Sequence, residues 1–341
     1  MKTVGLVGAT GLVGQTILQV LAKRKFPVAS LRLWASSRSQ GKKIRFGGRI
    51  YPVNVLREPD FAGCDFVFFA GTEGEQGASV LFAPKAVRAG AVVIDNGADF
   101  RMDPKVPLVV PEVNPGDAYW HKGIIANPNC STIQLAVALA PVYRAFGVKR
   151  IVAATYQSVS GAGRRGIETL DKEMQNAKTC PEFSKHARLT NGCKMQNAAF
   201  PRRIAGNVIP QIAEFKDLGY SGEEWKMVRE TQKIFHDGAI EINATAVRVP
   251  VLAGHAESVY FETRQAATVR EIERLLQRAS GIVYSKDTYH TPLEIAGKDE
   301  VFVSRLRPDP FNARAFAMWV VADNLRKGAA TNAVQIAEGL L

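Results

Sequence analysis

Short apolar runs alternate with segments of helical spacing in the first 100 residues of the chain. The apolar runs are residues 2–8, 31–36, 65–71 and 91–97. Between them, residues 12–24 and 73–90 carry apolar side chains at the spacing of amphipathic helices. Strands that alternate with helices predict a parallel sheet with helical crossovers. Because the runs lack strict polar alternation, we expect both faces of this sheet to be covered.

The pattern changes after about residue 149. Longer runs rich in β-branched residues predict strands at 150–161, 239–254 and 256–263. Helical spacing follows in four segments, at about 163–177, 222–236, 268–280 and 324–340. Residues 178–215, which include Cys180 and Cys193, show little periodicity and predict an irregular excursion. This half of the chain therefore predicts a second, larger sheet of mixed or antiparallel type.

Length and composition change this picture only slightly. The 341 residues exceed one ordinary hydrophobic core and predict two domains. The 46% hydrophobic and 22% charged residues are typical of a soluble globular protein. No apolar run has the length of a bilayer span, and the glycine-interrupted N-terminus does not resemble a signal peptide. Four cysteines without a C-x-x-C pair predict free thiols, no metal site and a cytoplasmic location.

The net charge of +12 raises the possibility of a nucleic-acid partner. The basic groups at 23–25, 164–165 and 202–203 are separate, however, and no nucleic-acid-binding motif accompanies them. We therefore expect no nucleic-acid partner, and attribute the charge to a solvated surface and to anionic small ligands.

A glycine motif, GATGLVG, lies between the first predicted strand and the first predicted helix. Its glycines are Gly8, Gly11 and Gly14. Glycine permits the tight turn and the close approach of a pyrophosphate, and the following helix supplies free N–H groups. The motif indicates a dinucleotide site, whereas its alternative is a strand–helix turn without a ligand.

The end of the second predicted strand favours NADP over NAD. An NAD site normally places an acidic residue there to bind the ribose hydroxyls. This chain has Ser36, Ser37 and Arg38, followed by Lys42 and Lys43. Hydroxyl and cationic groups suit a 2′-phosphate, and the alternative is a solvated basic loop.

Cys130 stands in ANPNCST, between an Asn-Pro-Asn turn and two hydroxyl residues. Ser131 or Thr132 is expected to cap the helix that follows. A cysteine at a helix N-terminus feels the positive end of the helix dipole, which predicts a lowered thiol pKa and a nucleophilic role. The alternative is an inert buried cysteine.

A thiolate nucleophile needs a residue that transfers protons. His255 lies between two predicted strands, at a position suited to project into a site. Arg248, seven residues earlier, is suited to bind a carboxylate. The alternatives are a structural turn histidine and a surface arginine.

Eight segments in this order resemble the aspartate-β-semialdehyde dehydrogenases. They are GATGLVGQ, SSRSQGKKI, VVPEVNP, NPNCSTIQL, YQSVSGAG, EEWKMVRETQKI, RVPVLAGHAES and WVVADNLRKGAATNAVQIAE. The resemblance covers essentially the whole chain, and its most specific parts are NPNCST and the spacing from Arg248 to His255. It implies an α/β protein with a Rossmann-like NADP-binding domain, 1–128 plus a C-terminal helix at about 322–341. An α+β catalytic and dimerisation domain with a large mixed sheet, 129–321, completes the expected homodimer subunit.

The resemblance also implies NADPH-dependent reductive dephosphorylation of L-aspartyl 4-phosphate to L-aspartate 4-semialdehyde. Cys130 would be the nucleophile, His255 the general acid/base, and Gln157 a group that orients the acyl-enzyme. Arg248 would hold the substrate carboxylate and Glu223 its amino group. The phosphoryl group would contact Arg101, Lys226 and Asn129. NADP would contact Gly8, Thr10, Gly11, Leu12, Val13, Ser36, Ser37, Arg38, Gly161 and Asn324.

The residue chemistry is consistent with this assignment. Thiolate attack on an acyl phosphate releases a good leaving group and gives a thioester, a good hydride acceptor. Backbone N–H groups at the helix start are expected to stabilise the oxyanion. Two departures from the family pattern stand out: Asp99 places a negative charge near Arg101, and Gly254 replaces the usual Ser or Cys before His255.

Two other functions compete with this one. N-acetyl-γ-glutamyl-phosphate reductase shares the fold and the thiol chemistry, but its cysteine motif resembles G-C-Y-P-T, where this chain has N-C-S-T. A catalytically silent paralogue, kept as a binding protein, should have lost some of Cys130, Gln157, Arg248 and His255. All four are present.

Overall fold

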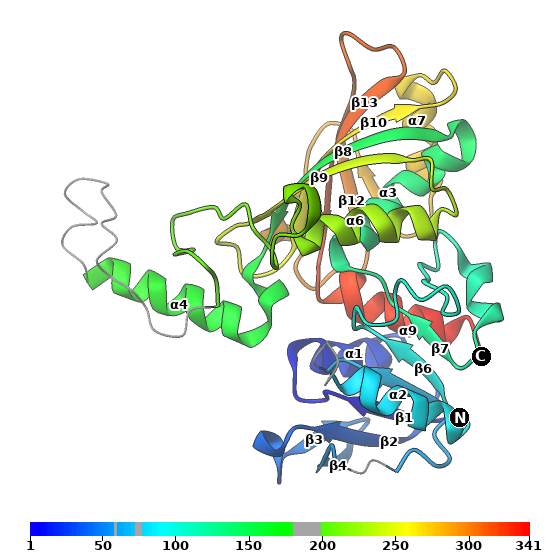
Figure 1. Cartoon of the computed structure of the whole chain (residues 1–341), viewed down its shortest axis with the longest axis vertical. Coiled ribbons are helices and arrows are strands. Elements are labelled where there is room, and N and C mark those ends of the chain that lie inside the picture. The colour runs from blue at the N-terminus through cyan, green and yellow to red at the C-terminus, as the bar shows by residue number, and fades with distance from the viewer. Residues whose placement is uncertain (58–59, 72–76, 180–198) are drawn as a thin grey trace.

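The computed structural model describes residues 1–57, 60–71, 77–179 and 199–341. It contains two sheets, which lie one above the other in Figure 1. Helices cover them, so the expected α/β architecture with a second domain built on a large mixed sheet is confirmed. Cys180 and Cys193 lie outside the described residues.

The first sheet is parallel except at one edge. Its strand order is β3-β4-β2-β1-β5-β6-β7, and only β3 runs antiparallel to its neighbour. The strands are β1 (Lys2–Val7), β2 (Val28–Ala35), β3 (Lys43–Phe46), β4 (Arg49–Val55), β5 (Phe66–Phe69), β6 (Val92–Asp95) and β7 (Ile124–Ala126). The order reverses at β1, and such a switch point places a cleft at the carboxyl ends of the central strands.

The second sheet is mixed, with the order β11-β12-β13-β10-β8-β9. Its strands are β8 (Val148–Gln157), β9 (Glu241–Arg248), β10 (His255–Thr263), β11 (Ile282–Ser285), β12 (Val301–Pro308) and β13 (Ala315–Ala322). β8 and β9 run parallel, and β10 runs antiparallel to both β8 and β13. Gln157, Arg248 and His255 therefore lie close together, at the adjacent ends of the neighbouring strands β8, β9 and β10.

The helices and helical turns complete the fold. The α-helices are α1 (Leu12–Lys23), α2 (Ala78–Arg88), α3 (Cys130–Phe146), α4 (Gly163–Thr179), α6 (Gly222–Ile234), α7 (Val269–Arg278), α8 (Pro292–Ile295) and α9 (Thr331–Glu338). Short 3-10 turns are η1 (Ser37–Ser39), η2 (Pro115–Trp120), η3 (Val159–Ala162) and η4 (Asp217–Gly219), and η5 (Arg326–Ala330) is π-helical. α9 returns to the first sheet, where its apolar residues share a buried cluster with those of α1. No helix among the described residues has the length and apolarity of a membrane span.

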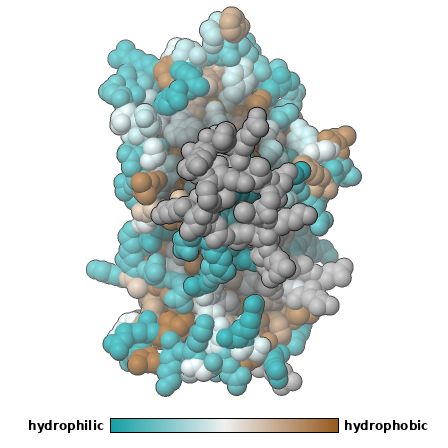
Figure 2. All heavy atoms as spheres, turned by 90° about the vertical axis from the view of Figure 1, so that its left-hand side faces the viewer, coloured by the Kyte–Doolittle hydropathy of each residue, from teal (hydrophilic) through white to brown (hydrophobic). Residues whose placement is uncertain are grey.

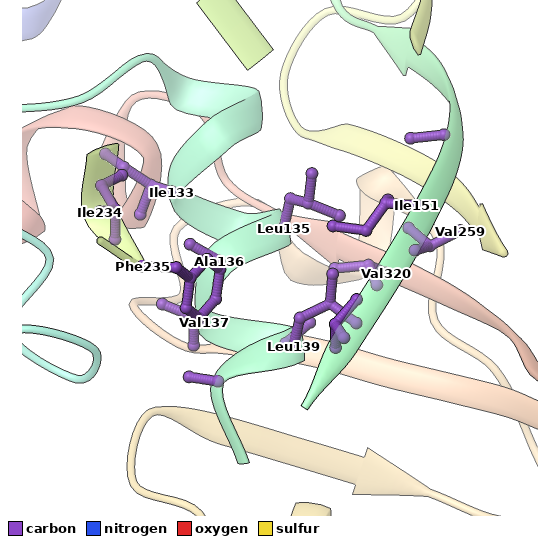
Figure 3. Packing of buried hydrophobic residues seen from close by; sticks show 14 of the residues in the cluster. Ile133, Leu135, Ala136, Val137, Leu139, Ile151, Ile234, Phe235, Val259 and Val320 are labelled. Carbon is purple, nitrogen blue, oxygen red and sulfur yellow. The ribbon is translucent and has the colours of Figure 1, made fainter. Parts of the chain in front are cut away.

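Helix α3 is the main support of the second domain. Its residues from Ser131 to Ala140 are all buried, so this part of the helix is enclosed on every side. Figure 3 shows Leu135 and Leu139 packed against Val320 and Ile151 of the second sheet. Each such fully buried side chain contributes about 1.5–3 kcal/mol to folding. This packing fixes the helix start, and with it Cys130.

Helix α4 projects from the body of the protein, on the left in Figure 1. Figure 2 shows the face on this side, where hydrophobic residues are scattered among hydrophilic ones around the atoms of uncertain placement. Residues 199–215, at the end of the expected irregular segment, form no helix and only isolated bridge pairs in the described chain.

Several expected elements differ from the observed ones. The run 239–254 ends as a strand at Arg248, because Pro250 has no N–H to continue the ladder. The run 150–161 ends at Gln157 and continues as η3. The single helix expected at 324–340 is a π-helical turn followed by α9. Strands β3, β4, β7, β11, β12 and β13 are additional to those predicted.

Candidate active site

The start of helix α3 is fixed by Asn129. Its side-chain Oδ1 accepts hydrogen bonds from the N–H groups of Ser131 (3.0 Å) and Thr132 (3.3 Å). The cap is therefore Asn129, and the expectation of a Ser131 or Thr132 cap is wrong. The N–H of Asn129 itself donates to Glu230 at 2.6 Å. These three N–H groups are paired within the protein, so the expected helix-start oxyanion site does not hold for them.

A pocket of about 300 Å³ lies at this helix start, between the two sheets. Cys130 is partly exposed and lines this pocket together with Asn129 and the turn that precedes it. Residues from both halves of the chain complete the lining. They are Val13, Asn96, Arg101, Asn127, Pro128, Gln157, Ser160, Gly161, Ile212, Ala213, Glu223, Lys226, Arg248, Asn324, Leu325, Gly328 and Ala329.

Glu223 connects three other polar groups of the pocket. Its Oε1 accepts hydrogen bonds from Asn129 Nδ2 (2.9 Å) and Gln157 Nε2 (3.0 Å), and its Oε2 lies 3.7 Å from Lys226 Nζ. Gln157 is oriented further by Thr155, whose hydroxyl donates to Gln157 Oε1 at 3.0 Å. The carboxylate of Glu223 is 5% exposed and is stabilised mainly by Lys226.

His255 lies directly behind the pocket wall. Its Nδ1 accepts the Ser158 N–H at 3.1 Å, and a neutral ring with this acceptor carries its proton on Nε2. Nε2 has no hydrogen-bond partner among the described residues. A side chain built on Gly161 would lie 3.3 Å from this atom and 2.7 Å from Arg248, so glycine keeps both groups accessible. Asn324 accepts the Gly254 N–H at 2.9 Å and thereby holds the start of β10.

Arg101 and Glu230 form a buried ion pair beside Cys130. Arg101 Nη1 lies 3.1 Å from Glu230 Oε1, and the guanidinium also donates to the carbonyl oxygens of Asn127 (2.9 Å) and Asn96 (2.8 Å). Burial raises the pKa of the Glu230 carboxyl, while Arg101 and the N–H of Asn129 oppose this rise. Glu230 is thus an acidic partner of Arg101 in this site.

The glycine motif forms a close strand–helix turn at the carboxyl end of β1. Gly8 has a φ of +84°, and a Cβ there would lie 2.3 Å from the Ala70 carbonyl oxygen. Helix α1 begins after Gly11, which offers no side-chain cap to its first N–H groups. Thr10 Oγ1 lies 2.9 Å from Ser39 Oγ, so the motif adjoins the turn that follows β2. This arrangement fits a dinucleotide phosphate, because a helix start with uncapped N–H groups attracts anions.

Comparison with known proteins decides the family. The family model described as "Semialdehyde dehydrogenase, NAD binding domain" matches residues 3–120, and "Semialdehyde dehydrogenase, dimerisation domain" matches residues 139–327. An aspartate-semialdehyde dehydrogenase from Aquifex aeolicus is 47% identical, over 99% of this chain and 97% of that protein. The chain belongs to the aspartate-semialdehyde dehydrogenase family. One from Bacillus subtilis is 45% identical over 99% of this chain and 96% of its own length.

Solved structures of aspartate-semialdehyde dehydrogenases share this fold over the whole chain. The Vibrio cholerae enzyme II complexed with ASA has a TM-score of 0.92 and 47% identity, and covers 100% of this chain and 98% of its own. A Candida albicans aspartate-semialdehyde dehydrogenase with NADP has a TM-score of 0.73 and 25% identity, with 100% and 98% coverage. The recognised family is thus confirmed, and the N-acetylglutamyl-phosphate alternative finds no support among these relatives.

The pKa values of Cys130 and His255 differ from those expected from the sequence. Burial, followed by the Glu223 carboxylate, raises the pKa of the Cys130 thiol to about 12. Burial, followed by Arg248, lowers the pKa of His255 to about 3. The expected lowering of the thiol pKa by the helix dipole is therefore wrong for this structure, since desolvation exceeds it. The pair rests as a neutral thiol and a neutral imidazole.

The structure brings most of the predicted site residues of the family to one place. Val13, Arg101, Asn129, Cys130, Gln157, Gly161, Glu223, Lys226, Arg248 and Asn324 line the pocket. His255 lies just behind Gly161, while Gly8, Thr10, Gly11, Leu12, Ser36, Ser37 and Arg38 lie outside the pocket, at the turns that follow β1 and β2. Sequence reasoning missed Glu230, Asn127 and Gly328. Glu230 lies seven residues after Glu223, so helical periodicity alone would have placed both on one face of α6.

The departure at Gly254 has a steric reason. Its φ is +87°, and a Cβ there would lie 2.9 Å from Cβ of Pro292. Any larger residue would strain the turn that leads into His255. The glycine is therefore required by the position of α8 in this chain.

Proposed function

We propose that this aspartate-semialdehyde dehydrogenase converts L-aspartyl 4-phosphate to L-aspartate 4-semialdehyde and phosphate with NADPH as reductant. The reaction belongs to the biosynthesis of lysine, methionine and threonine. The observation that carries the proposal is the placement of Cys130 in a pocket whose charged lining groups are two arginines, a lysine and a glutamate. These charges match a dianionic phosphoryl group, a carboxylate and an ammonium group.

Cys130 acts as the nucleophile in this proposal. Its Sγ attacks the acyl carbon, a C–S bond forms, the C–O bond to phosphate breaks, and phosphate leaves with the bonding electrons. NADPH, when bound, would supply a hydride to the thioester carbon; the C–S bond then breaks, which releases the aldehyde and returns the Cys130 sulfur as a thiolate. The thiol proton must leave before attack, and His255 Nε2 faces the region where a proton is exchanged with Cys130 and the leaving aldehyde. Gln157 orients the acyl group through its bonds to Glu223 and Thr155.

The charge of the bound substrate is expected to change the pKa of His255. Arg248 is the second cause of the low His255 pKa, after burial. A substrate carboxylate bound to Arg248 would offset that charge and raise the pKa of His255 toward neutrality. We assign Glu223, which lies beside Lys226, to the substrate ammonium group, and Arg101, Lys226 and Asn129 to the phosphoryl group, because all four line the pocket.

NADP is the cofactor we assign. Gly8, Thr10, Gly11, Leu12 and Val13 would hold its pyrophosphate at the start of α1. Ser36, Ser37 and Arg38 would bind the 2′-phosphate, since no carboxylate stands at the end of β2. Gly161 and Asn324 adjoin the same pocket and would contact the nicotinamide end.

We further propose a cytoplasmic homodimer. The NADP-binding domain comprises 1–128 with about 322–341, and the catalytic and dimerisation domain comprises 129–321. These domain bounds are supported by the end of β7 at Ala126, in the first sheet, and by the start of α3 at Cys130, against the second sheet.

The homodimer contact that we propose lies on the outer side of β8. There the side chains of Val152 and Tyr156 are 41% and 40% exposed.

The test follows NADPH formation from aspartate semialdehyde, phosphate and NADP, with N-acetylglutamate semialdehyde and NAD assayed in parallel. We expect activity with the aspartyl substrate and NADP, and loss of activity in Cys130→Ser with an unchanged circular dichroism spectrum. Activity with the acetylated substrate would refute the substrate assignment, and equal activity with NAD would refute the cofactor preference. A folded protein without activity on either substrate would refute the enzymatic function.

A further inference from the structure

Helix α6 presents a second acidic residue to the active site, in addition to Glu223, which is paired with Lys226. Glu230 lies two turns after Glu223 on this helix and is 1% exposed. Buried carboxylates are costly unless hydrogen bonds and opposite charges compensate them. The burial of Glu230 therefore indicates that its two carboxylate oxygens have a specific role in the site.

Each oxygen of Glu230 binds a different part of the site. Oε1 accepts from Arg101 Nη1 at 3.1 Å, and Oε2 accepts the backbone N–H of Asn129 at 2.6 Å. One carboxylate thus connects the arginine proposed for the phosphoryl group with the residue that precedes the nucleophile. Both contacts have an N–H donor, which is the pattern of an ionised carboxylate.

A second residue of the same helix holds the segment that carries Arg101. Lys233 Nζ donates to the carbonyl oxygens of Arg101 (2.7 Å), Asp103 (2.8 Å) and Val106 (2.8 Å). One turn of α6 therefore fixes both the backbone of residues 101–106, through Lys233, and the side-chain direction of Arg101, through Glu230. Because the guanidinium is planar, these bonds determine the plane that it presents to a ligand.

We propose that Glu230 is a positioning residue that aims Arg101 at the phosphoryl group and holds the Asn129–Cys130 backbone in register with it. This inference rests on the proposed function, because it specifies the phosphate side of the same site. Glu230 acts through Arg101 and Asn129 and does not itself contact substrate. Loss of the Glu230 carboxylate should selectively weaken phosphate binding. This is expected even though the loss also removes a negative charge near the bound anion.

The experiment compares Glu230→Gln with wild type in phosphate-dependent turnover of aspartate semialdehyde. Glutamine keeps the size but has one acceptor oxygen, so either Arg101 or the Asn129 N–H loses its partner. We expect KM for phosphate to rise about tenfold or more, which corresponds to ~1.4 kcal/mol, with KM for aspartate semialdehyde changed less than twofold. Glu224→Gln is the matched control, since Glu224 is also buried on α6 and accepts two backbone N–H groups, from Ser221 and Ala246, away from the pocket. It should leave KM for phosphate unchanged.

A second readout does not depend on turnover. Inorganic phosphate should protect Cys130 of the wild type from iodoacetamide, and Glu230→Gln should need about tenfold more phosphate for equal protection. If Glu230→Gln does not fold, Glu230→Asp keeps the charge, withdraws it by one methylene, and should show the same selective loss. An unchanged or lower KM for phosphate, or an equal rise in both KM values, would refute the positioning role. A wild type without turnover refutes the proposed function instead, and the alkylation assay then decides the inference alone.

Discussion

At the scale of single residues, the resting site is an uncharged pair inside a set of charged groups. Cys130 keeps its proton because burial and Glu223 both raise the thiol pKa. His255 stays neutral because burial and Arg248 both lower its pKa. Low reactivity without substrate protects the thiol from oxidation, since the thiolate is the form that reacts.

Replacing Glu223 tests how much its carboxylate, the second cause after burial, raises the pKa of the Cys130 thiol. Glu223→Gln keeps an oxygen that can accept from Asn129 and Gln157, but removes the negative charge. The Cys130 pKa should fall, and iodoacetamide labelling of the ligand-free protein at pH 8 should accelerate about tenfold for each unit of pKa. Lys226 is paired with the Glu223 carboxylate and lowers the thiol pKa, so Lys226→Met is expected to slow labelling. A Glu223→Gln rate equal to that of wild type would contradict this account.

Glu257 is a further buried acid, two residues after His255 on β10. Burial raises its pKa to about 8, with Gln134 of α3 as a polar neighbour. Between about pH 4.5 and 8 the folded protein retains a proton that the unfolded chain has lost, so stability falls as pH rises through this window. Glu257→Gln removes this dependence. The stability of the variant relative to wild type should grow by up to about 1.4 kcal/mol per pH unit.

Urea unfolding at pH 5.5 and 7.5, at one fixed protein concentration, measures the effect. The expected result is a larger advantage of Glu257→Gln at pH 7.5. The same difference at both pH values would show that Glu257 is ionised in the folded protein.

At the scale of elements, the π-helical turn η5 is the least regular part of the site. Its Gly328 lies against the nucleophile: a Cβ on Gly328 would be 2.9 Å from Cβ of Cys130. π-helical turns are rare and are often found at functional sites. The sequence RKGAATNAV carries no signal that separates this turn from the α9 helix that continues it.

The variant Gly328→Ala should therefore displace Cys130 or η5 and lower kcat at least tenfold, because misplacement by a fraction of an ångström is costly in catalysis. Gly339→Ala, after α9, meets no atom closer than 3.5 Å and serves as the control. Steady-state kinetics, with circular dichroism to verify folding, distinguish the two variants. Normal kcat in Gly328→Ala would show that the contact with Cys130 relaxes without consequence.

At the scale of the whole molecule, the C-terminal segment joins the two halves of the chain. Lys327 is fully buried and donates to Glu112 (2.6 Å), Gln335 (2.8 Å) and Asn332 (3.0 Å). Asn332 in turn donates to Asn127 Oδ1 at 2.7 Å, in the turn that precedes the nucleophile. Asp299 accepts hydrogen bonds both from the exposed Lys23 and from the buried Arg326.

Lys327→Met should destabilise the protein by about 3–5 kcal/mol, because it leaves the Glu112 carboxylate buried without its charged partner. The matched control is Lys23→Met, which breaks an ion pair whose lysine is 57% exposed and should cost less than about 1 kcal/mol. Thermal unfolding compares the two variants at equal concentration. Similar losses in both would mean that burial does not distinguish these pairs.

Much of this molecule could be predicted from the sequence, because apolar periodicity and turn residues act locally. Such patterns predict the strands that precede Gly8 and that end at Gln157, and they place His255 next to a strand. The β-branched and aromatic run AFAMWVVA of β13 held the same kind of signal, but the prediction did not include it. The buried pairs Arg101–Glu230 and Glu112–Lys327 could not be predicted, because the two members of each pair are more than 120 residues apart along the chain. The pKa values of Cys130 and His255 also depend on burial, which no local pattern reveals.

The position of η5 in the chain has a consequence for synthesis. Asn324, Leu325, Gly328 and Ala329 form one wall of the pocket and follow every other lining residue in the sequence. A growing polypeptide therefore carries its cysteine through nearly 200 residues of elongation before that wall exists. Until then the pocket around Cys130 is incomplete, so the proposed chemistry requires the C-terminal segment to be synthesised first.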